Sequence, residues 1–322
     1  MKLSLVVPCY NEEGNVKAFA DACAKAFDGH IASYEIVFVN DGSKDGTWEQ
    51  LKQLKNSSGQ NIKLVNFSRN FGKEAAMYAG LRKAAGDYVT IIDADLQQRP
   101  EIVVEMVDLL DNNEELDSIA AYQAERKEGK VVSFFKKCFY KLINKISDIE
   151  FYPGASDFRT FRRPMVNAIL EITECHRFSK GIFSWVGFNT HYIPYTVEAR
   201  NAGTSSWSMK KLFKYAVEGI TAFTVFPLKV STFVGVLLAV ASLIYMIIVI
   251  IQKLAFGIAV QGYATIVVLI LLIGGIQLIC LGVIGEYISR IYIQGKNRPI
   301  YIIKEYIESE PKEIEDKKEE TV

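Results

Sequence analysis

The stretch TIIDADLQQRP, residues 90–100, places two carboxylates, Asp93 and Asp95, one residue apart directly after a short apolar run. Hard cations such as Mg²⁺ and Mn²⁺ bind carboxylate oxygens and substrate phosphates together. A D-x-D triplet alone is common on solvated loops, so its meaning depends on the surrounding elements. Here it follows a buried strand, which favours a divalent metal site at a point where the strand reaches the surface.

The elements that must position this triplet alternate between strand and helix. Apolar strands are expected at 3–8, 34–40, 62–68 and 87–93, and an amphipathic helical segment follows each of them. This alternation predicts an α/β domain with a mainly parallel sheet. In such sheets, ligands bind beyond the carboxyl ends of the strands.

Polar segments follow all four predicted strands. They are PCYNEE with Tyr10 and Glu12, NDGSKDGT with Asp41, SRNFGKE, and DADLQ. Neither a GxGxxG nor a GxxxxGK[ST] loop occurs, so a glycine-rich phosphate loop of those types is not expected. A divalent metal could instead neutralise the charge on a departing diphosphate.

The last third of the chain has the composition of a membrane protein. Residues 230–251 form a run of 22 residues without a charge, and residues 254–285 form a second run of 32. A helix of about 20 apolar residues crosses a bilayer core. Two transmembrane helices are therefore expected, near 228–251 and 263–285, since two such runs rarely occur together in soluble folds.

Charge and cysteine content place the rest of the chain in the cytoplasm. Basic residues flank the expected spans on their outer sides, whereas the segment between them carries only Lys253. This asymmetry predicts cytoplasmic ends. Five cysteines without a CxxC pair, and no visible signal peptide, favour a reducing compartment. The formal net charge of zero argues against a nucleic-acid partner.

The chain is expected to have four parts. These are a cytoplasmic catalytic domain at 1–207, an amphipathic juxtamembrane helix at 208–227, the two spans within 228–286, and a cytoplasmic segment at 287–322. A second basic amphipathic segment, 132–146, could lie on the membrane or pack on the domain. The charged tail from about 304 is expected to be disordered.

The motifs VVPCYNEE, VNDGSKDGT, RNFGKE and DADLQQRPE resemble glycosyltransferase family 2, the inverting nucleotide-sugar transferases with a GT-A fold. SDFRTFRR, RNAGTSSWS and GEYISRIYIQGKNRPIY extend the resemblance to its polyprenyl-phosphate members, which carry two C-terminal spans. The resemblance covers roughly 3–303. It implies a sugar transfer from a nucleotide-sugar to a polyprenyl phosphate, with Mg²⁺ or Mn²⁺ as the cofactor.

The resemblance also implies roles for individual residues. Those matching the nucleotide-sugar site are Pro8, Tyr10, Glu12, Asp41, Asp93 and Ala94, and the metal pair is Asp95 and Gln97. Those matching the acceptor-phosphate site are Arg126, Arg200, Ser205 and Ser206. Asp157 matches an acid near the transferred sugar, where it could orient hydroxyls or act as a base. Asp157, Asp95 and Arg126 are the expected catalytic residues.

One departure affects the acceptor site. Many relatives carry a second arginine three residues before the position of Arg126, and here that position is Gln123. The acceptor phosphate would then be held by fewer charges, or by Lys127 or Lys130. Trp185 could line the acceptor pocket or belong to the core.

Several alternatives remain at this level. UDP-glucose is the favoured donor, with N-acetylglucosamine, galactose, mannose and aminoarabinose donors open. A processive synthase would need a Q-x-x-R-W motif and more spans. A non-catalytic membrane scaffold would have no reason to keep DADLQ. A homo-oligomer such as a tetramer, a separate flippase and a downstream glycosyltransferase are the expected partners.

Overall fold

The structure is a computed structural model of the 322-residue chain. It describes residues 2–123, 151–196, 224–256 and 262–308, together with 140–141, 143–145, 147, 149 and 221. The chain divides into two units. One contains residues 1–135, 151–206 and 299–322, and the other contains residues 136–150 and 207–298.

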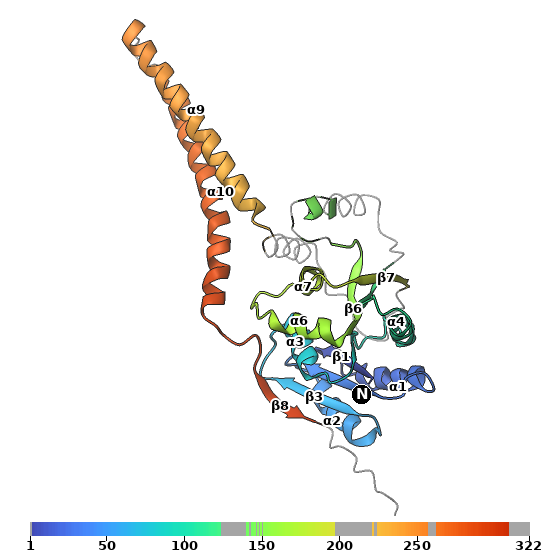
Figure 1. The fold of residues 1–322 in the computed structure, drawn as a ribbon. Helices are drawn as coiled ribbons and strands as arrows, with labels where there is room; N and C mark the ends of the chain where they lie inside the picture. The colour runs from blue at the N-terminus through green and yellow to red at the C-terminus, as the bar shows by residue number, and fades with distance from the viewer. Residues whose placement is uncertain are drawn as a thin grey trace, which may run out of the picture. The chain divides into compact units, whose positions relative to one another are not determined.

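The first unit is built on one eight-stranded sheet with the order β7-β5-β6-β4-β1-β2-β3-β8 (Figure 1). The strands are β1 Leu3–Cys9, β2 Tyr34–Asn40, β3 Ile62–Phe67, β4 Tyr88–Ile91, β5 Ser118–Gln123, β6 Ala155–Arg162, β7 Thr190–Tyr195 and β8 Ile303–Ile307. Strands β4, β1, β2 and β3 are parallel neighbours, and β5 is parallel to β7. Strands β6 and β8 run antiparallel to their neighbours. The predicted mainly parallel α/β domain is confirmed.

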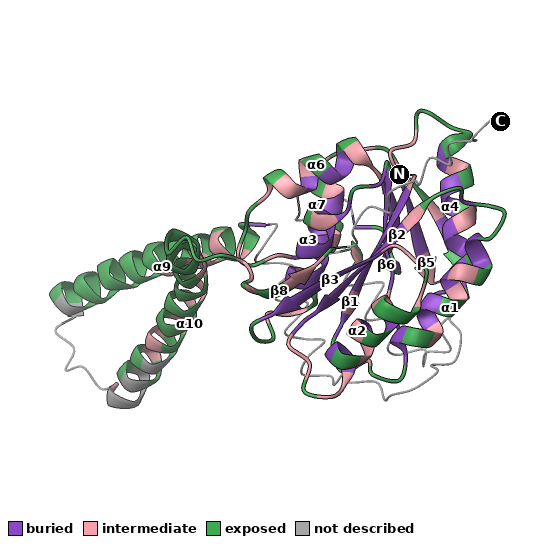
Figure 2. Cartoon of the chain, turned by 90° about the horizontal axis from the view of Figure 1, so that it is seen from below, coloured by how far each residue is buried: buried purple, intermediate pink, exposed green. Residues whose placement is uncertain are grey.

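Helices cover both faces of this sheet (Figure 2). Those on one face are α1 Val16–Phe27, α2 Thr47–Ser57 and α4 Glu101–Asp111, and those on the other are α3 Lys73–Lys83, α6 Arg163–Glu171 and α7 Ser179–Trp185. Successive strand residues point to opposite faces. Leu5 and Val7 therefore join the core under α1, α2 and α4, whereas Val37 and Val39 pack against α3. Because both faces are buried, the strands are apolar throughout.

Helix α3 approaches the sheet closely at Gly80. A Cβ atom at this position would overlap the side chain of Val6 and press on Val39 at 3.3 Å. Both neighbours are fully buried, so neither can move freely. This close approach matters for function because α3 also carries Lys73 in its first turn.

Gly80→Ala is therefore expected to destabilise the fold by about 1 to 3 kcal/mol, although alanine normally favours a helix. Thermal or denaturant unfolding of the purified protein would measure the change. Gly59→Ala is the matched control, because a Cβ there meets no atom within 4 Å. Equal stability of the two variants would contradict the tight α3 contact.

The chain returns to the sheet after its last helix. Strand β8 pairs antiparallel with β3, from Leu64 opposite Ile307 to Phe67 opposite Ile303. Tyr301 stacks on Phe67 with ring centroids 5.0 Å apart. The expectation of a disordered tail from about 304 is therefore wrong for 304–307, because backbone pairing with β3 outweighs the charged composition.

The second unit contains two long apolar helices, α9 Phe226–Phe256 and α10 Tyr263–Gly295. Within them, Phe226–Gln252 and Val268–Gly295 are long and apolar enough to cross a membrane. Their side chains are mostly exposed (Figure 2), unlike those of a buried pair of core helices. Glu286 and Arg290 pair one turn apart at 3.2 Å, as their spacing predicts.

Candidate active site

The polar turns after β1 and β2 are tied together by hydrogen bonds. The backbone N–H of Glu12 donates to Thr47 Oγ1 at 2.8 Å, and that of Asn11 donates to Ser43 Oγ at 3.0 Å. Tyr10, directly before Asn11, has 42% of its surface exposed. Pro8 lies in β1 opposite Val39 of β2. The first two strand ends therefore form one rigid edge with an exposed tyrosine.

Asp41 follows β2 and is almost fully buried, with 3% exposure. Its carboxylate accepts the backbone N–H groups of Phe71, at 2.6 Å, and Gly72, at 2.9 Å. Burial raises the pKa of Asp41, and these two hydrogen bonds and the charge of Arg69 oppose the rise. Asp41 thus holds the loop before α3, in addition to any contact with a nucleotide that the sequence predicts.

Lys73 is the first residue of α3 and connects two of the predicted site residues. Its Nζ atom lies 2.6 Å from Asp93 Oδ1 and 3.7 Å from Asp157 Oδ2. Asp93 follows β4, and Asp157 lies within β6, its antiparallel neighbour. Three segments distant in sequence meet at this point of the sheet edge.

The electrostatics of this cluster keep Asp157 ionised. Burial by itself raises the pKa of Asp157, but the positive charges of Lys180, Lys73 and Arg159 lower it below its ordinary value. Its Oδ1 atom is buried and has no hydrogen-bond partner among the described residues. Burial would lower the pKa of Lys73, but the charges of Asp93 and Asp157 raise it. Asp157 in this cluster is therefore expected to stay ionised, and one of its two carboxylate oxygens forms no hydrogen bond with the described residues.

The DADLQ turn is locally constrained. Asp95 Oδ1 accepts a hydrogen bond from the backbone N–H of Gln97 at 3.2 Å. Leu96, between these two residues, has a backbone φ of 59°, which residues other than glycine rarely adopt. Gln98 is buried, and its amide bonds both the backbone N–H of Asp93, at 3.0 Å, and its carboxylate, at 3.4 Å. The carboxylates of Asp93 and Asp95 therefore have different hydrogen-bond partners within the same turn.

The residues of DADLQ differ in burial. Ala94 is 2% exposed, whereas Asp93, Asp95 and Gln97 are partly exposed. No group of three His, Cys, Asp or Glu side chains among the described residues is placed to hold a metal ion. A cation here would therefore need further ligands from a bound phosphate and water, which is the usual mode of Mg²⁺.

The acceptor-site residues of the sequence analysis lie outside the described part of the chain. This applies to Arg126, Arg200, Ser205 and Ser206. Trp185, at the end of α7, has 61% of its surface exposed. The core-packing interpretation of Trp185 is therefore wrong, because the helix ends with this side chain in solvent.

Sequence reasoning missed Lys73 and Gln98 as site residues. Both stand inside motifs that were recognised, RNFGKE and DADLQQRPE, but spacing alone could not show which side chains turn toward Asp93. Only the pairing of β4 with β6 brings Asp157 to the same lysine. The available signal was that Lys73 begins the helix that follows the polar turn after the third strand.

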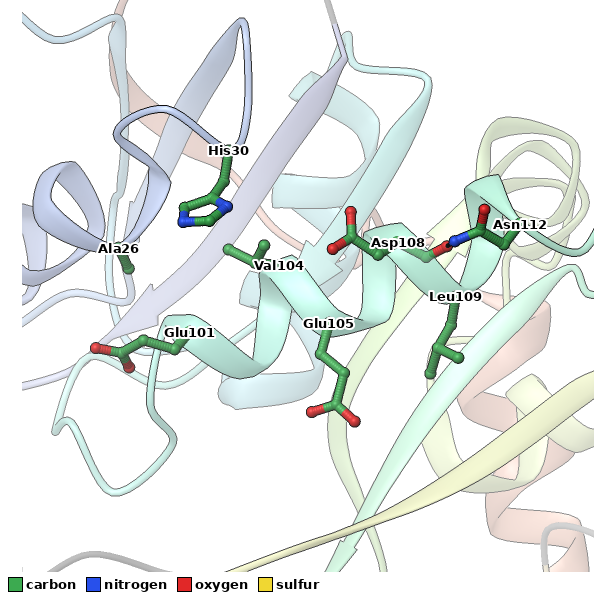
Figure 3. A pocket seen from close by; sticks show the side chains of 8 residues that line it. All are labelled: Ala26, His30, Glu101, Val104, Glu105, Asp108, Leu109 and Asn112. Atoms are coloured by element: carbon green, nitrogen blue, oxygen red, sulfur yellow. Dashed lines mark hydrogen bonds between the residues drawn. The ribbon is translucent and has the colours of Figure 1, made fainter.

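A separate groove of about 450 Å³ lies between α1 and α4 (Figure 3). Its lining residues are Ala26, His30, Glu101, Val104, Glu105, Asp108, Leu109 and Asn112. None of them belongs to the cluster around Lys73, and the acidic side chains point away from one another. The groove is therefore not part of the candidate active site.

Such a sheet, with a D-x-D turn and further acids at its carboxyl edge, defines an α/β glycosyltransferase of the GT-A type. The profile of glycosyl transferase family 2 matches residues 4–170, and that of the GtrB C-terminal hairpin matches residues 226–291. The chain belongs to glycosyltransferase family 2.

Full-length relatives support this assignment. The uncharacterized glycosyltransferase sll0501 of Synechocystis is 42% identical over 306 residues, covering 95% of both chains. The SfII prophage-derived bactoprenol glucosyl transferase of Shigella flexneri is 43% identical over 305 residues, covering 94% of this chain and 98% of its own. The similarity extends through the catalytic domain and the apolar hairpin, so the chain is a glycosyltransferase with both parts.

Proposed function

We propose that the protein is a membrane-anchored, inverting hexosyltransferase. It moves a sugar, with UDP-glucose as the favoured donor, to a polyprenyl phosphate at the cytoplasmic face. The observation that carries this function is the cluster of Asp93, Lys73 and Asp157 beside the Asp95 turn. The 43% identity to a bactoprenol glucosyl transferase supports the lipid acceptor and the hexose.

Asp157 suits the orienting role better than the role of a base. A carboxylate whose pKa is lowered by neighbouring cations holds a proton weakly. A phosphate monoester is already ionised at neutral pH and needs no strong general base. The Oδ1 atom of Asp157 has no hydrogen-bond partner among the described residues, and a sugar hydroxyl could donate to it once the side chains that bury it move aside. Positioning and electrostatics would then supply most of the catalysis.

Asp95 and Gln97 are the proposed ligands for Mg²⁺ or Mn²⁺. Their oxygens belong to one short turn and would bind such a cation together with the donor diphosphate. When bound, the cation stabilises the negative charge of the departing nucleoside diphosphate. Lys73 adds a second, permanent positive charge to the same edge of the sheet.

Chain topology supports a hairpin with both ends on the same side of the membrane. Strand β3 precedes the two apolar helices and β8 follows them, yet the two strands pair in one sheet. A chain that crosses a membrane twice returns to its starting side, whereas a single crossing would separate β3 from β8. An active site anchored in this way could reach a lipid phosphate at the bilayer surface.

The other assignments extend this function. N-acetylglucosamine, galactose, mannose and aminoarabinose donors are the alternatives to glucose. A homo-oligomer such as a tetramer, a flippase and a downstream glycosyltransferase would complete the pathway. A non-catalytic scaffold is the candidate from another class, and it is disfavoured because a scaffold has no need of a lysine held between two carboxylates.

The test is nucleotide release by the detergent-purified protein with undecaprenyl phosphate, Mg²⁺ or Mn²⁺, and a panel of UDP- and GDP-sugars. Release with one donor, dependent on both lipid phosphate and metal, is the expected result, with UDP-glucose fastest. Release that is independent of lipid phosphate would contradict the acceptor. A folded protein that releases nothing from any donor would favour the scaffold.

A further inference from the structure

A second contact lies directly behind the Lys73 cluster and joins α3 to α7. Glu74 Oε2 accepts the backbone N–H of Ser179 at 3.0 Å and also the hydroxyl of Ser179. Ser179 is the first residue of α7 and is only 3% exposed. The Glu74 carboxylate thus occupies the position of a helix cap for α7, although it comes from a different helix.

This contact fixes two lysines at once. Lys73 precedes Glu74 at the start of α3, and Lys180 follows Ser179 at the start of α7. Lys73 Nζ lies 3.7 Å from Asp157, and Lys180 is close enough for its charge to lower the pKa of Asp157. The ammonium group of Lys73 therefore lies beside Asp157, and the charge of Lys180 acts on Asp157 from α7. The two helices that carry these lysines are joined by one partly buried hydrogen-bonded pair.

We propose that Glu74 is a positioning residue, which clamps α7 to α3 and thereby holds Lys73 and Lys180 around Asp157. This inference rests on the proposed function for its effect on turnover. Glu74 itself is not expected to touch the donor or the acceptor, because its bonded oxygen faces Ser179. Its contribution is the geometry of two cations whose charges keep Asp157 ionised.

The charged groups that face Glu74 come from two other elements. Asp157 approaches from β6, and Arg177 approaches from the loop before α7, where its guanidinium lies over the Tyr78 ring at 4.3 Å. Burial and the charge of Asp157 raise the pKa of Glu74 to about 7, although Ser179 and Arg177 oppose the rise. Burial and the nearby charge of Asp157 therefore make the ionised form of Glu74 energetically unfavourable, and the hydrogen bonds from Ser179 offset part of that free-energy cost.

The bonding pattern supplies a matched pair of variants. Both bonds from Ser179 end on the same Glu74 oxygen, so the amide oxygen of Glu74→Gln can accept them both. Glu74→Ala removes the acceptor and leaves the start of α7 uncapped. Turnover is expected to fall about 10- to 100-fold in Glu74→Ala, which is the loss of rate expected when the groups of an active site are slightly misplaced. Turnover should be largely retained in Glu74→Gln.

Two readouts of the full-length protein in detergent test the clamp. The first is nucleotide release between pH 5 and 9. Both variants lose the negative charge of Glu74, and this loss by itself lowers the pKa of Asp157, so the two are compared with each other. The pKa of Asp157 should be higher in Glu74→Ala than in Glu74→Gln, because Lys180 moves away only in Glu74→Ala, and the acid limb of activity should lie at a higher pH in that variant. Glu171→Ala, which removes an exposed glutamate on α6, serves as the control and should match the wild type.

The second readout needs no turnover. Pulse labelling with acetic anhydride and peptide mass spectrometry would give the acetylation rate of Lys180, relative to exposed Lys25 on α1. The rate for Lys180 should increase several-fold in Glu74→Ala and stay near the wild-type value in Glu74→Gln and Glu171→Ala. An unchanged rate in Glu74→Ala, or an equal increase in Glu74→Gln, would overturn the clamp. A wild type that turns over no donor would instead refute the proposed function, and the labelling would still decide on Glu74.

Discussion

Asp95→Ala is expected to lower nucleotide release about 10²- to 10³-fold, the loss typical of removing one electrostatic contact to the leaving group. Asp95 is the charged member of the proposed metal pair, and its Oδ1 already orders the turn by accepting the N–H of Gln97. Without this carboxylate, the diphosphate would leave with less of its charge neutralised. The fold should survive, because Asp95 is only partly buried at a sheet edge.

Two measurements would check this result. Nucleotide release would give the loss of activity, and the melting temperature with and without Mn²⁺ and UDP would give binding without turnover. The wild type and Asp108→Ala, an exposed acid on α4, should be stabilised by Mn²⁺ with UDP, and Asp95→Ala should not. If Asp95→Ala kept most of its activity, or kept the full thermal shift, the cation would have to be held elsewhere.

Lys73→Met is expected to lower turnover about 100-fold, since it removes a positive charge from the reaction centre and also misplaces two acids. Methionine keeps the length of the side chain but not its charge. Asp93 and Asp157 would then face each other without the ammonium that now lies 2.6 Å from one and 3.7 Å from the other. Their mutual repulsion would favour protonation of one of them.

The pH dependence of Lys73→Met has a definite sign. The charges of Lys180, Lys73 and Arg159 lower the pKa of Asp157 in the wild type, against the effect of burial. Removing one cation raises that pKa, so a larger fraction of Asp157 is protonated at a given pH. If activity needs ionised Asp157, the acid limb of the pH profile should lie at a higher pH in Lys73→Met than in the wild type. Raising the pH should then restore part of the lost activity of this variant.

A series of kcat values between pH 5 and 9 would measure this shift. Lys25→Met, at an exposed position of α1, is the control for loss of a positive charge as such. A uniform loss at every pH would show that Lys73 acts on the donor and not on the ionisation of Asp157. Unchanged activity would remove Lys73 from the site altogether.

The local patterns of the sequence were sufficient for most of the architecture. Alternating apolar strands and amphipathic helices predicted the first four strands and the mainly parallel sheet, and two uncharged runs predicted α9 and α10. These features depend on periodicity within a single segment, which the sequence displays directly. The DADLQ turn could be placed at a strand end for the same reason.

Pairings between distant segments could not be read in this way. Strand β8 is short and charged, and it is a strand only because β3 offers it an open edge. Asp41 was predicted to contact the nucleotide, yet its carboxylate also holds the loop before α3. Both facts depend on which segments meet, and residue spacing does not encode that.

By itself the sequence determined the class of fold, the acidic turn and the apolar hairpin, because each is expressed in neighbouring residues. The tertiary structure alone decided that Lys73 lies between Asp93 and Asp157, and that Glu74 holds α7 through Ser179. These contacts join α3, β4, β6 and α7, which lie far apart in the chain. Charges interact through space over a few ångströms, so the chemistry of the site emerges only when the sheet brings those segments together.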